Sequence, residues 1–326
     1  MMSNRLKRLS LLVLAILLLC TGCQSAPGED GADDTPVPPA ADDSTDWMDT
    51  VVIDGVTYRR RTDLKTILFL GIDDAQTVKA EGGVVGNNGR SDTMILFILD
   101  EGNKTVRPLT ISRNSMTEVD VYKGNGDLAY SGQMQINMQY SFGNSAVRSC
   151  FLTKRTVSEL LYDTPIDGYL AMTMAGISVI VDELGGVTLV MPEDYTEIDK
   201  RYTEGAKVTL TGADAERFVR YRDITVAGSN ETRADRQSWF IYSLFQQMRA
   251  KGNMADSVEH LLAAVDDYVE TDLDAETMKM LVNCTLLDES LKVPGTTVEG
   301  ELYDEYHVDE EALQALLIQL FYEPVE

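Results

Sequence analysis

Charged side chains collect where apolar runs of this chain begin or end. Asp73 follows the run "ILFLGI", and Arg90 and Asp92 stand directly before the run "TMILFIL". If the two runs form neighbouring strands, both carboxylates can reach one metal ion, and Mg²⁺ prefers such oxygen ligands. Either aspartate could instead be a loop or capping residue, and spacing alone leaves both interpretations open.

Arginines gather at similar positions. Arg113 follows "PLTIS", Arg220 and Arg222 form "RYR", and Arg233 and Arg236 open an expected helix. Residues two apart in an extended segment point the same way, and residues three apart on a helix share a face. One guanidinium group can donate to two phosphate oxygens at once, and a helix N-terminus adds partial positive charge. Any single arginine is more often a surface ion pair, but their convergence in an acidic chain favours a phosphate site.

Composition excludes several classes of function. The net charge of -25 argues against a nucleic-acid partner, because phosphate backbones attract basic surfaces. The chain has only two histidines, His260 and His307, which leaves little for a Ser-His-Asp triad or a multi-histidine zinc site. With 326 residues and 44% hydrophobic content, a sizeable core can form.

The first residues are typical of a secretory signal. Arg5, Lys7 and Arg8 precede the run "LSLLVLAILLLC", which is shorter than the roughly 20 apolar residues of a membrane span. Thr21-Gly22-Cys23 resembles the end of a bacterial lipobox, although Cys20 stands where leucine is usual. We therefore expect a signal segment over 1–23, lipidation of Cys23, and a position on the outer face of the cell membrane. An ordinary signal peptide or an uncleaved anchor are the alternatives.

Residues 24–48 form an acidic linker in this interpretation. The segment has four prolines, seven acidic residues and no Lys or Arg, so it cannot bury apolar surface and should be disordered. Beyond it, Cys150 and Cys284 could pair outside the cytoplasm or be buried separately.

From residue 49 the pattern indicates strands alternating with helices. A hairpin is expected around Asp54-Gly55, a buried strand in "KTILFLGID", and two strands joined by a turn at Glu101–Lys104. A loop-rich stretch with "KGNGD" follows. Helices are expected in "SCFLTKRTVSELLYD" and "AGISVIVDELGG", at 211–220 and 233–250, and in three segments of the tail, with strands in "DGYLAMTM" and "VTLVM". This alternation predicts an α/β fold, a single three-layer α-β-α domain with a mixed central sheet and a C-terminal helical extension, over 49–326.

An ordered set of motifs resembles a known family. The segments "ILFLGID", "GRSDTMILF", "PLTISRNSM", "QINMQYSFG", "LGGVTLVMPEDY", "LTGADAERFVRYRD" and "TRADRQ" cover roughly residues 63–250 and resemble the LytR-CpsA-Psr phosphotransferases. The resemblance implies an extracytoplasmic enzyme of cell-wall assembly. Such an enzyme would move a glycopolymer phosphate, as in teichoic acid or capsule, from a polyprenyl pyrophosphate carrier onto peptidoglycan.

The resemblance also implies roles for single residues. Asp73 and Asp92 would be the catalytic and Mg²⁺ (or Mn²⁺) carboxylates, and Arg113 would be a third catalytic residue. The residues implied to grip the pyrophosphate are Arg90, Arg220, Arg222, Arg233, Arg236 and Gln237, with Arg113 beside them. Phosphoryl transfer depends mainly on positioning and charge stabilisation, so arginines and a metal suffice without histidine.

Three features depart from the family's pattern. No arginine follows Asp73 closely, Asn114 stands where an aspartate is frequent, and a lipid anchor would replace the usual transmembrane helix. The alternative function is a non-catalytic lipoprotein that binds polyprenyl phosphate or another solute. A carbohydrate receptor is disfavoured, because the chain has only two tryptophans and Trp47 lies in the linker. A glycoside hydrolase could use paired carboxylates, but it would not explain the arginines.

Overall fold

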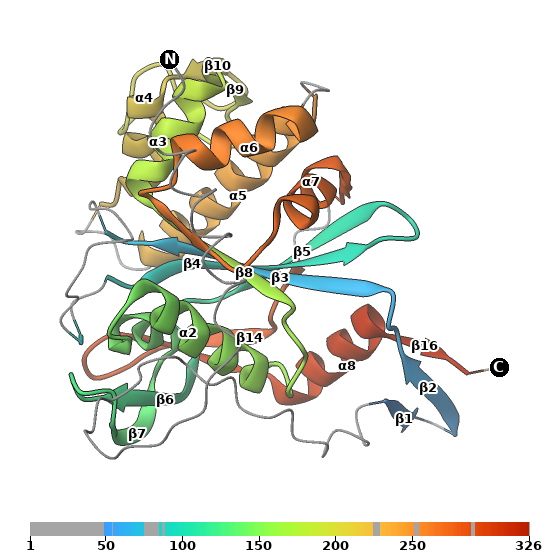
Figure 1. Cartoon of the computed structure of the whole chain (residues 1–326). Helices are drawn as coiled ribbons and strands as arrows, with labels where there is room; N and C mark the ends of the chain where they lie inside the picture. Colours follow the sequence, from blue (N-terminus) through green and yellow to red (C-terminus); the bar gives the residue numbers. More distant parts are fainter. Residues whose placement is uncertain are drawn as a thin grey trace, which may run out of the picture. The chain divides into compact units, whose positions relative to one another are not determined.

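In a computed structural model of the chain, a mixed seven-stranded sheet lies between two helical layers (Figure 1). The structure describes residues 49–53, 55–74, 85–86, 89–223, 229–250, 254–287 and 291–325. The expected lipidation site at Cys23 and the linker 24–48 lie outside these residues. Among the described residues, no helix is both long and apolar enough to cross a membrane.

The sheet has the order β11-β8-β3-β4-β5-β12, and β13 also pairs with β5. Its strands are β3 (Leu64–Ile72), β4 (Ser91–Asp100), β5 (Thr105–Ile111), β8 (Gly168–Thr173), β11 (Val269–Thr271), β12 (Thr285–Leu286) and β13 (Leu291–Lys292). β3 and β4 are antiparallel, as are β4 and β5, whereas β8 runs parallel to β3. The predicted mixed sheet is therefore confirmed.

Two apolar cores explain why the central strands are continuous apolar runs. Ile67 and Phe69 of β3 face one core, while Leu68 and Leu70 face the other. Because successive side chains of a strand point to opposite faces, a strand covered on both sides must be apolar throughout. The three-layer α-β-α prediction is confirmed.

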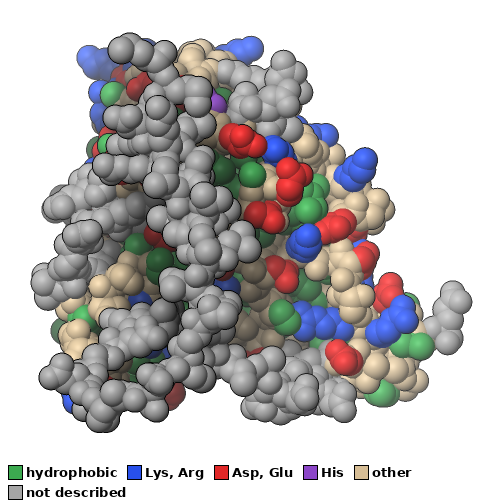
Figure 2. Space-filling view, in the orientation of Figure 1, with side chains coloured by type: hydrophobic (Ala, Val, Ile, Leu, Met, Phe, Trp, Pro, Cys, Tyr) green, Lys and Arg blue, Asp and Glu red, His purple; other side chains and the backbone are tan. Residues whose placement is uncertain are grey.

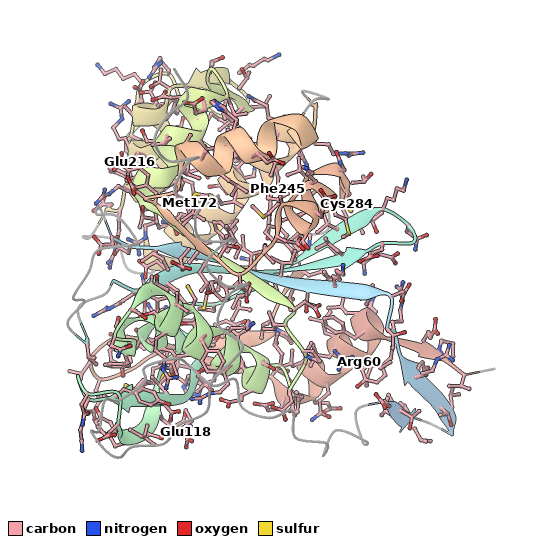
Figure 3. All side chains as sticks on the ribbon, in the orientation of Figure 1. Arg60, Glu118, Met172, Glu216, Phe245 and Cys284 are labelled. Atoms are coloured by element: carbon pink, nitrogen blue, oxygen red, sulfur yellow. The ribbon has the colours of Figure 1, made fainter. Side chains whose placement is uncertain are left out.

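The upper layer in Figure 1 consists of α3 to α7 and covers the first core. Its elements are α3 (Met174–Glu183), β9 (Val187–Val190), β10 (Lys207–Leu210), α4 (Gly212–Arg220), α5 (Ser229–Ala250), α6 (Met254–Ala264) and α7 (Ala275–Asn283). Met172, Phe245 and Cys284 lie on this side of the sheet (Figure 3). Gly185 and Gly186 end α3 with positive φ, as the "LGG" motif predicts.

The lower layer covers the second core with η1 (Ile136–Phe142), α2 (Ala146–Leu160) and α8 (Glu310–Phe321). The hairpin of β6 (Met116–Tyr122) and β7 (Leu128–Gln135) lies below α2 in Figure 1, and β14 (Gly295–Glu299) pairs with β15 (Asp304–Val308) in a second hairpin. The expected loop is present at "KGNGD", but the stretch around it is not loop-rich, because its flanks form β6 and β7. "KGNGD" is the turn of this hairpin, in which Lys123 N donates to Asp127 O at 2.8 Å and Gly126 has a φ of 87°.

The ends of the described chain meet in a small separate sheet. The predicted hairpin forms as β1 (Thr50–Ile53) with β2 (Val56–Arg60), and β16 (Tyr322–Pro324) pairs with β2 on its other side. α5 begins at Ser229, four residues before the predicted start. Cys150 and Cys284 are both free and buried, and they belong to different cores on opposite faces of the sheet, so separate burial is the correct alternative.

Candidate active site

The candidate site lies at the edge of the sheet where β3, β5 and β8 end and β4 begins. This follows from the pairing, because β3 and β8 run one way while β4 runs against both β3 and β5. Asp73 follows β3, Asp92 lies at the start of β4, and Arg113 comes two residues after β5. Three charged residues from distant parts of the chain are thereby placed at one edge.

A β-bulge turns Asp92 out of the regular ladder. Gly71 pairs with Thr93 and Ile72 pairs with Ser91, which leaves Asp92 without a partner opposite it. The carbonyl oxygen of Arg90 accepts from Asp73 N at 2.9 Å and from Asp92 N at 3.0 Å. A bulge bends its strand and re-aims the extra side chain. Here it places the carboxylate at the sheet edge, where Arg233 of the upper layer and Asn137 of the lower layer both contact it.

Asp92 is buried between two guanidinium groups. Its Oδ2 is 2.6 Å from the Nη2 of Arg233 and forms a second ion pair with the Nη1 of Arg113. The side chains of Arg113 and Arg233 are only 10% and 12% exposed. Asp92 itself is only 2% exposed, so it is buried although it lies at a strand end. Its partners lie 21 and 141 positions away in sequence, so local spacing could not reveal the enclosure.

Burial dominates the electrostatics of these three residues. Removal from water raises the pKa of the Asp92 carboxyl, while attraction to Arg113 and Arg233 opposes that rise. The same burial lowers the pKa of Arg113 against the attraction of Asp92. Asp73 is close enough for its charge to raise the pKa of Asp92. Perturbed ionisable groups that share a site are typical of functional centres.

Several buried polar atoms at this edge have no hydrogen-bond partner within the described structure. They are the Nε of Arg113, the Nε of Arg233, the Oδ1 of Asn137 and the hydroxyls of Ser91 and Thr173. An unpaired buried donor costs about 1–3 kcal/mol. An anionic ligand could accept hydrogen bonds from the two unpaired N–H donors of these neighbouring guanidinium groups.

Asn137 is a site residue that the sequence reasoning missed. It lies on η1, is fully buried, and its Nδ2 donates to Asp92 Oδ1 at 3.3 Å. Its backbone N–H bonds the carbonyl of Arg113, so it holds two members of the site. A signal was available: an amide between apolar neighbours in "QINM" is costly to bury unless its polar group has a function.

Asp73 and Arg90 are exposed and flank the buried group. Two carboxylates with open acceptor capacity suit Mg²⁺, which commonly takes one or two carboxylates and fills its shell with phosphate oxygens and water. Among the described residues, no group of three or more His, Cys, Asp or Glu could hold a metal ion. Asp73 and Asp92 thus fit a metal ion whose coordination shell is completed by substrate oxygens, and they do not fit an ion coordinated by protein side chains alone.

Arg220 and Arg222 are both exposed and lie at the end of α4. Arg220 is the last residue of that helix and forms a surface ion pair with Glu216, one turn earlier, at 2.8 Å. The two arginines therefore do not share an extended segment, as the sequence reasoning assumed. The described contacts do not join Arg220 to the Asp92 group.

Arg236 and Gln237 are buried and bind the backbone of α4. The Nε of Arg236 donates to Phe218 O at 2.9 Å, and its Nη2 donates to Tyr221 O. Gln237 donates to Val219 O at 3.0 Å and accepts from the hydroxyl of Thr93 at 2.7 Å. These two side chains fasten the end of α4, where Arg220 and Arg222 lie, to α5 and β4.

Asn114 follows Arg113 and is buried, and its side chain and carbonyl contact other elements. Its Oδ1 accepts from the Nε2 of Gln135 at 3.0 Å, and its carbonyl accepts from Tyr306 N at 2.9 Å. The residue therefore ties the loop of Arg113 to β7 and β15. An amide satisfies this position without a charge, which gives a structural reason for the departure from aspartate.

Comparison with known proteins agrees with this architecture. A sequence model described as the LytR_cpsA_psr family matches residues 38–321. Over 262 residues the chain is 29% identical to the polyisoprenyl-teichoic acid–peptidoglycan teichoic acid transferase TagU of Bacillus cereus, covering 78% of this chain and 77% of the relative. It is 30% identical to the transferase of the same name from Halalkalibacterium halodurans, with 65% of this chain and 62% of that relative covered.

The fold is also similar to that of solved structures. The crystal structure of B. subtilis TagV aligns with a TM-score of 0.58 at 24% identity and covers 80% of this chain and 96% of that one. The family match extends over most of the chain and includes every element that carries the site. The chain belongs to the LytR_cpsA_psr family.

Proposed function

We propose that this protein transfers a glycopolymer phosphate from a polyprenyl pyrophosphate carrier onto peptidoglycan. The observation that carries the proposal is the buried Asp92, held by Arg113 and Arg233 from two other elements, with an open Nε donor on each arginine. The relatives named as teichoic acid transferases support the same reaction class.

The three buried charges have the character of a preorganised anion site. One carboxylate between two guanidinium groups leaves a net positive charge in a region that is largely closed to water. Charge–charge interactions there are stronger than in solvent. A pyrophosphate oxygen that takes the open Nε–H groups would gain charge-assisted hydrogen bonds and would remove the cost of unpaired donors.

The carboxylates have different proposed roles. Asp92 has its Oδ2 occupied by two arginines, so its role is to fix their orientation and to offer Oδ1 to a cation. Asp73 is exposed and is the better candidate to accept the proton of the acceptor hydroxyl. Mg²⁺ or Mn²⁺ held by Asp73 and Asp92 would neutralise charge on the pyrophosphate.

In the proposed reaction the acceptor hydroxyl of peptidoglycan attacks the phosphorus that bears the glycopolymer. A new P–O bond forms to the acceptor, and the P–O bond to the polyprenyl phosphate breaks. Arg113 and Arg233 stabilise the charge that develops on the leaving phosphate. Arg90, Arg220 and Arg222, which are exposed around the same end of the molecule, would hold the outer part of the donor.

A transfer assay tests the proposal. The purified protein is supplied with a lipid-linked glycopolymer and peptidoglycan, with Mg²⁺ or with EDTA, and the covalently attached polymer is measured. We expect metal-dependent attachment, and we expect Arg113→Gln to lower it at least about a hundredfold. Tight binding of the lipid donor by the wild type without any transfer would instead support the non-catalytic alternative.

We also propose that the protein is anchored through Cys23 on the outer face of the membrane. The short apolar run and the lipobox-like "TGC" support this. Fractionation of cells that express Cys23→Ser should move the protein from membranes to the soluble fraction. Membrane association of that variant equal to the wild type would disprove lipid anchoring.

A further inference from the structure

A cavity of about 350 Å³ lies between α5 and the far edge of the sheet. It is lined by Pro108 of β5, by Leu286, Leu287 and Lys292 from the region of β12 and β13, and by Asp235, Ser238, Trp239, Tyr242, Ser243 and Gln246 of α5. Its size is within the usual range for small-ligand sites, about 300–1,000 Å³. None of its lining residues belongs to the Asp92 group.

Two aromatic rings form one wall and are held in place. Trp239 and Tyr242 are three residues apart on α5 and therefore share a face. The ring of Trp239 packs edge-on against Phe218, with centroids 6.0 Å apart. The hydroxyl of Tyr242 lies 2.8 Å from that of Thr110 on β5. Aromatic surfaces fixed in advance lose little entropy when a ligand binds.

The remaining lining combines polar side chains with the apolar Pro108, Leu286 and Leu287. Asp235 and Lys292 form an ion pair at the rim, with side chains 57% and 53% exposed. Ser238, Ser243 and Gln246 add hydroxyl and amide groups. The hydroxyl of Ser243 donates to Trp239 O at 2.9 Å and keeps acceptor capacity for a ligand. A ring-shaped ligand with hydroxyl and amide substituents would use both the aromatic wall and the polar groups.

The elements that form both walls of the cavity also carry residues of the candidate active site. Trp239 follows Arg233 by six residues on α5, which is about 9 Å along the helix. Lys292 pairs with Thr110, three residues before Arg113, which is about 10 Å along an extended chain. The cavity is therefore far enough from Arg113 and Arg233 to be a separate site, and near enough for a chain of sugar rings to reach both.

We infer that this cavity binds a glycan of β-linked N-acetylhexosamines and holds the acceptor strand during transfer. The role as an acceptor subsite rests on the proposed function, whereas glycan binding itself does not. Trp239 would stack on a sugar ring, and Asp235, Ser243 and Gln246 would bond its hydroxyl and acetamido groups. The sequence argument against a carbohydrate site counted tryptophans but could not place Trp239 in a cavity.

The two tryptophans make binding measurable by fluorescence. In full-length protein carrying Trp47→Phe, held in detergent micelles, Trp239 is the sole tryptophan. The probes are a tetramer of β-1,4-linked N-acetylglucosamine, the matching glucose tetramer and a polyprenyl phosphate. We expect a saturable change with the N-acetylglucosamine tetramer, and at least about tenfold weaker binding of the glucose tetramer, which lacks acetamido groups.

A blocking variant and a matched control test the location. Ser243→Leu places a larger side chain in the cavity and suits a helix, while Ala250→Leu makes a similar change on α5 outside the lining. Ser243→Leu should weaken tetramer binding at least about tenfold and raise the KM for peptidoglycan with little change in kcat. Ala250→Leu should change neither quantity.

The outcomes separate this inference from the proposed function. Absence of a saturable response to the N-acetylglucosamine tetramer, or an equal response in Ser243→Leu, overturns the glycan site even if polymer transfer is normal. A response to polyprenyl phosphate alone also overturns it, because the cavity would then accommodate an isoprenoid. Tetramer binding that is sensitive to Ser243→Leu, without transfer by the wild type, supports the glycan site and overturns the proposed reaction.

Discussion

Replacement of Asp92 by asparagine should both destabilise the protein and abolish transfer. The side chain of Asp92 is 1% exposed. Loss of its negative charge leaves Arg113 and Arg233 as two neighbouring buried cations. An exposed strand-end carboxylate would behave differently, because loss of a capping or surface interaction costs only about 1 kcal/mol.

The magnitude follows from the burial of the three side chains. Breaking a buried ion pair by removing one partner costs about 3–5 kcal/mol. Asparagine keeps one oxygen that can accept from an arginine, so we expect the lower value, about 3 kcal/mol. For a domain of this size that corresponds to a fall in Tm of about 6–12 °C.

Thermal and urea unfolding of Asp92→Asn, with the transfer assay in parallel, measure both effects. A second change, Arg233→Met, removes one of the stranded cations, so the double variant should recover at least about 1 kcal/mol relative to the sum of the single variants. Transfer should stay absent in the double variant. A stability loss below about 1 kcal/mol together with normal Mg²⁺-dependent transfer would refute the reasoning and leave Asp73 as the principal carboxylate.

Three further predictions concern residues around the site and the fold. Arg236→Met should lower the free energy of unfolding in urea by about 2–4 kcal/mol, because it leaves the carbonyls of Phe218 and Tyr221 without their donor. Arg220→Ala, which removes a surface ion pair, should lower it by less than about 0.5 kcal/mol. Equal losses of stability in the two variants would contradict the distinction between a buried and a surface arginine. Burial alone would raise the pKa of Asp100, but hydrogen bonds from Asn103 and Arg61 lower it to about 2, so its stabilisation is present above about pH 4 and is lost as the pH falls toward 2. Asp100→Asn should therefore be less stable than the wild type by about 1–2 kcal/mol at pH 5, and the difference should narrow at pH 3; a constant difference across that range would contradict the assignment. In Gly143→Ala a Cβ would lie 2.4 Å from Ser149 N. The free energy of unfolding, measured by thermal unfolding, should therefore fall by about 1–3 kcal/mol. A variant as stable as the wild type would show that the connection between η1 and α2 is less tightly packed than described.

The layers of the fold could be predicted because their signals are local. Runs such as "ILFLGI" are apolar at every position, as a strand covered on both faces must be, and "LGG" marks the end of α3. The β6–β7 hairpin was missed mainly because β7, "LAYSGQMQ", is mostly exposed, although β6 buries Val119. A strand without a buried face has no hydrophobic alternation to reveal it.

The membership of the site was partly predictable, and its internal arrangement was not. Charged residues at strand ends gave Asp73, Asp92 and Arg113, because strand ends at one sheet edge converge. The burial of the Asp92 carboxylate depends on Arg233, which lies 141 residues later, and on a β-bulge that a single sequence does not show. The different tasks of Arg233 and Arg236 also depend on tertiary contacts, since both lie in one "R-x-x-R" motif but only Arg233 meets Asp92.

The small sheet of β1, β2 and β16 joins strands that are far apart in the sequence. β2 lies between β1 and β16, and Val325 N donates to Thr57 O at 2.8 Å beyond the last paired strand residue. An uncovered strand edge is a site at which strands of other chains can pair. β16 covers this edge of β2, so removal of residues 322–325 would expose it and would favour self-association at a position remote from the chemistry.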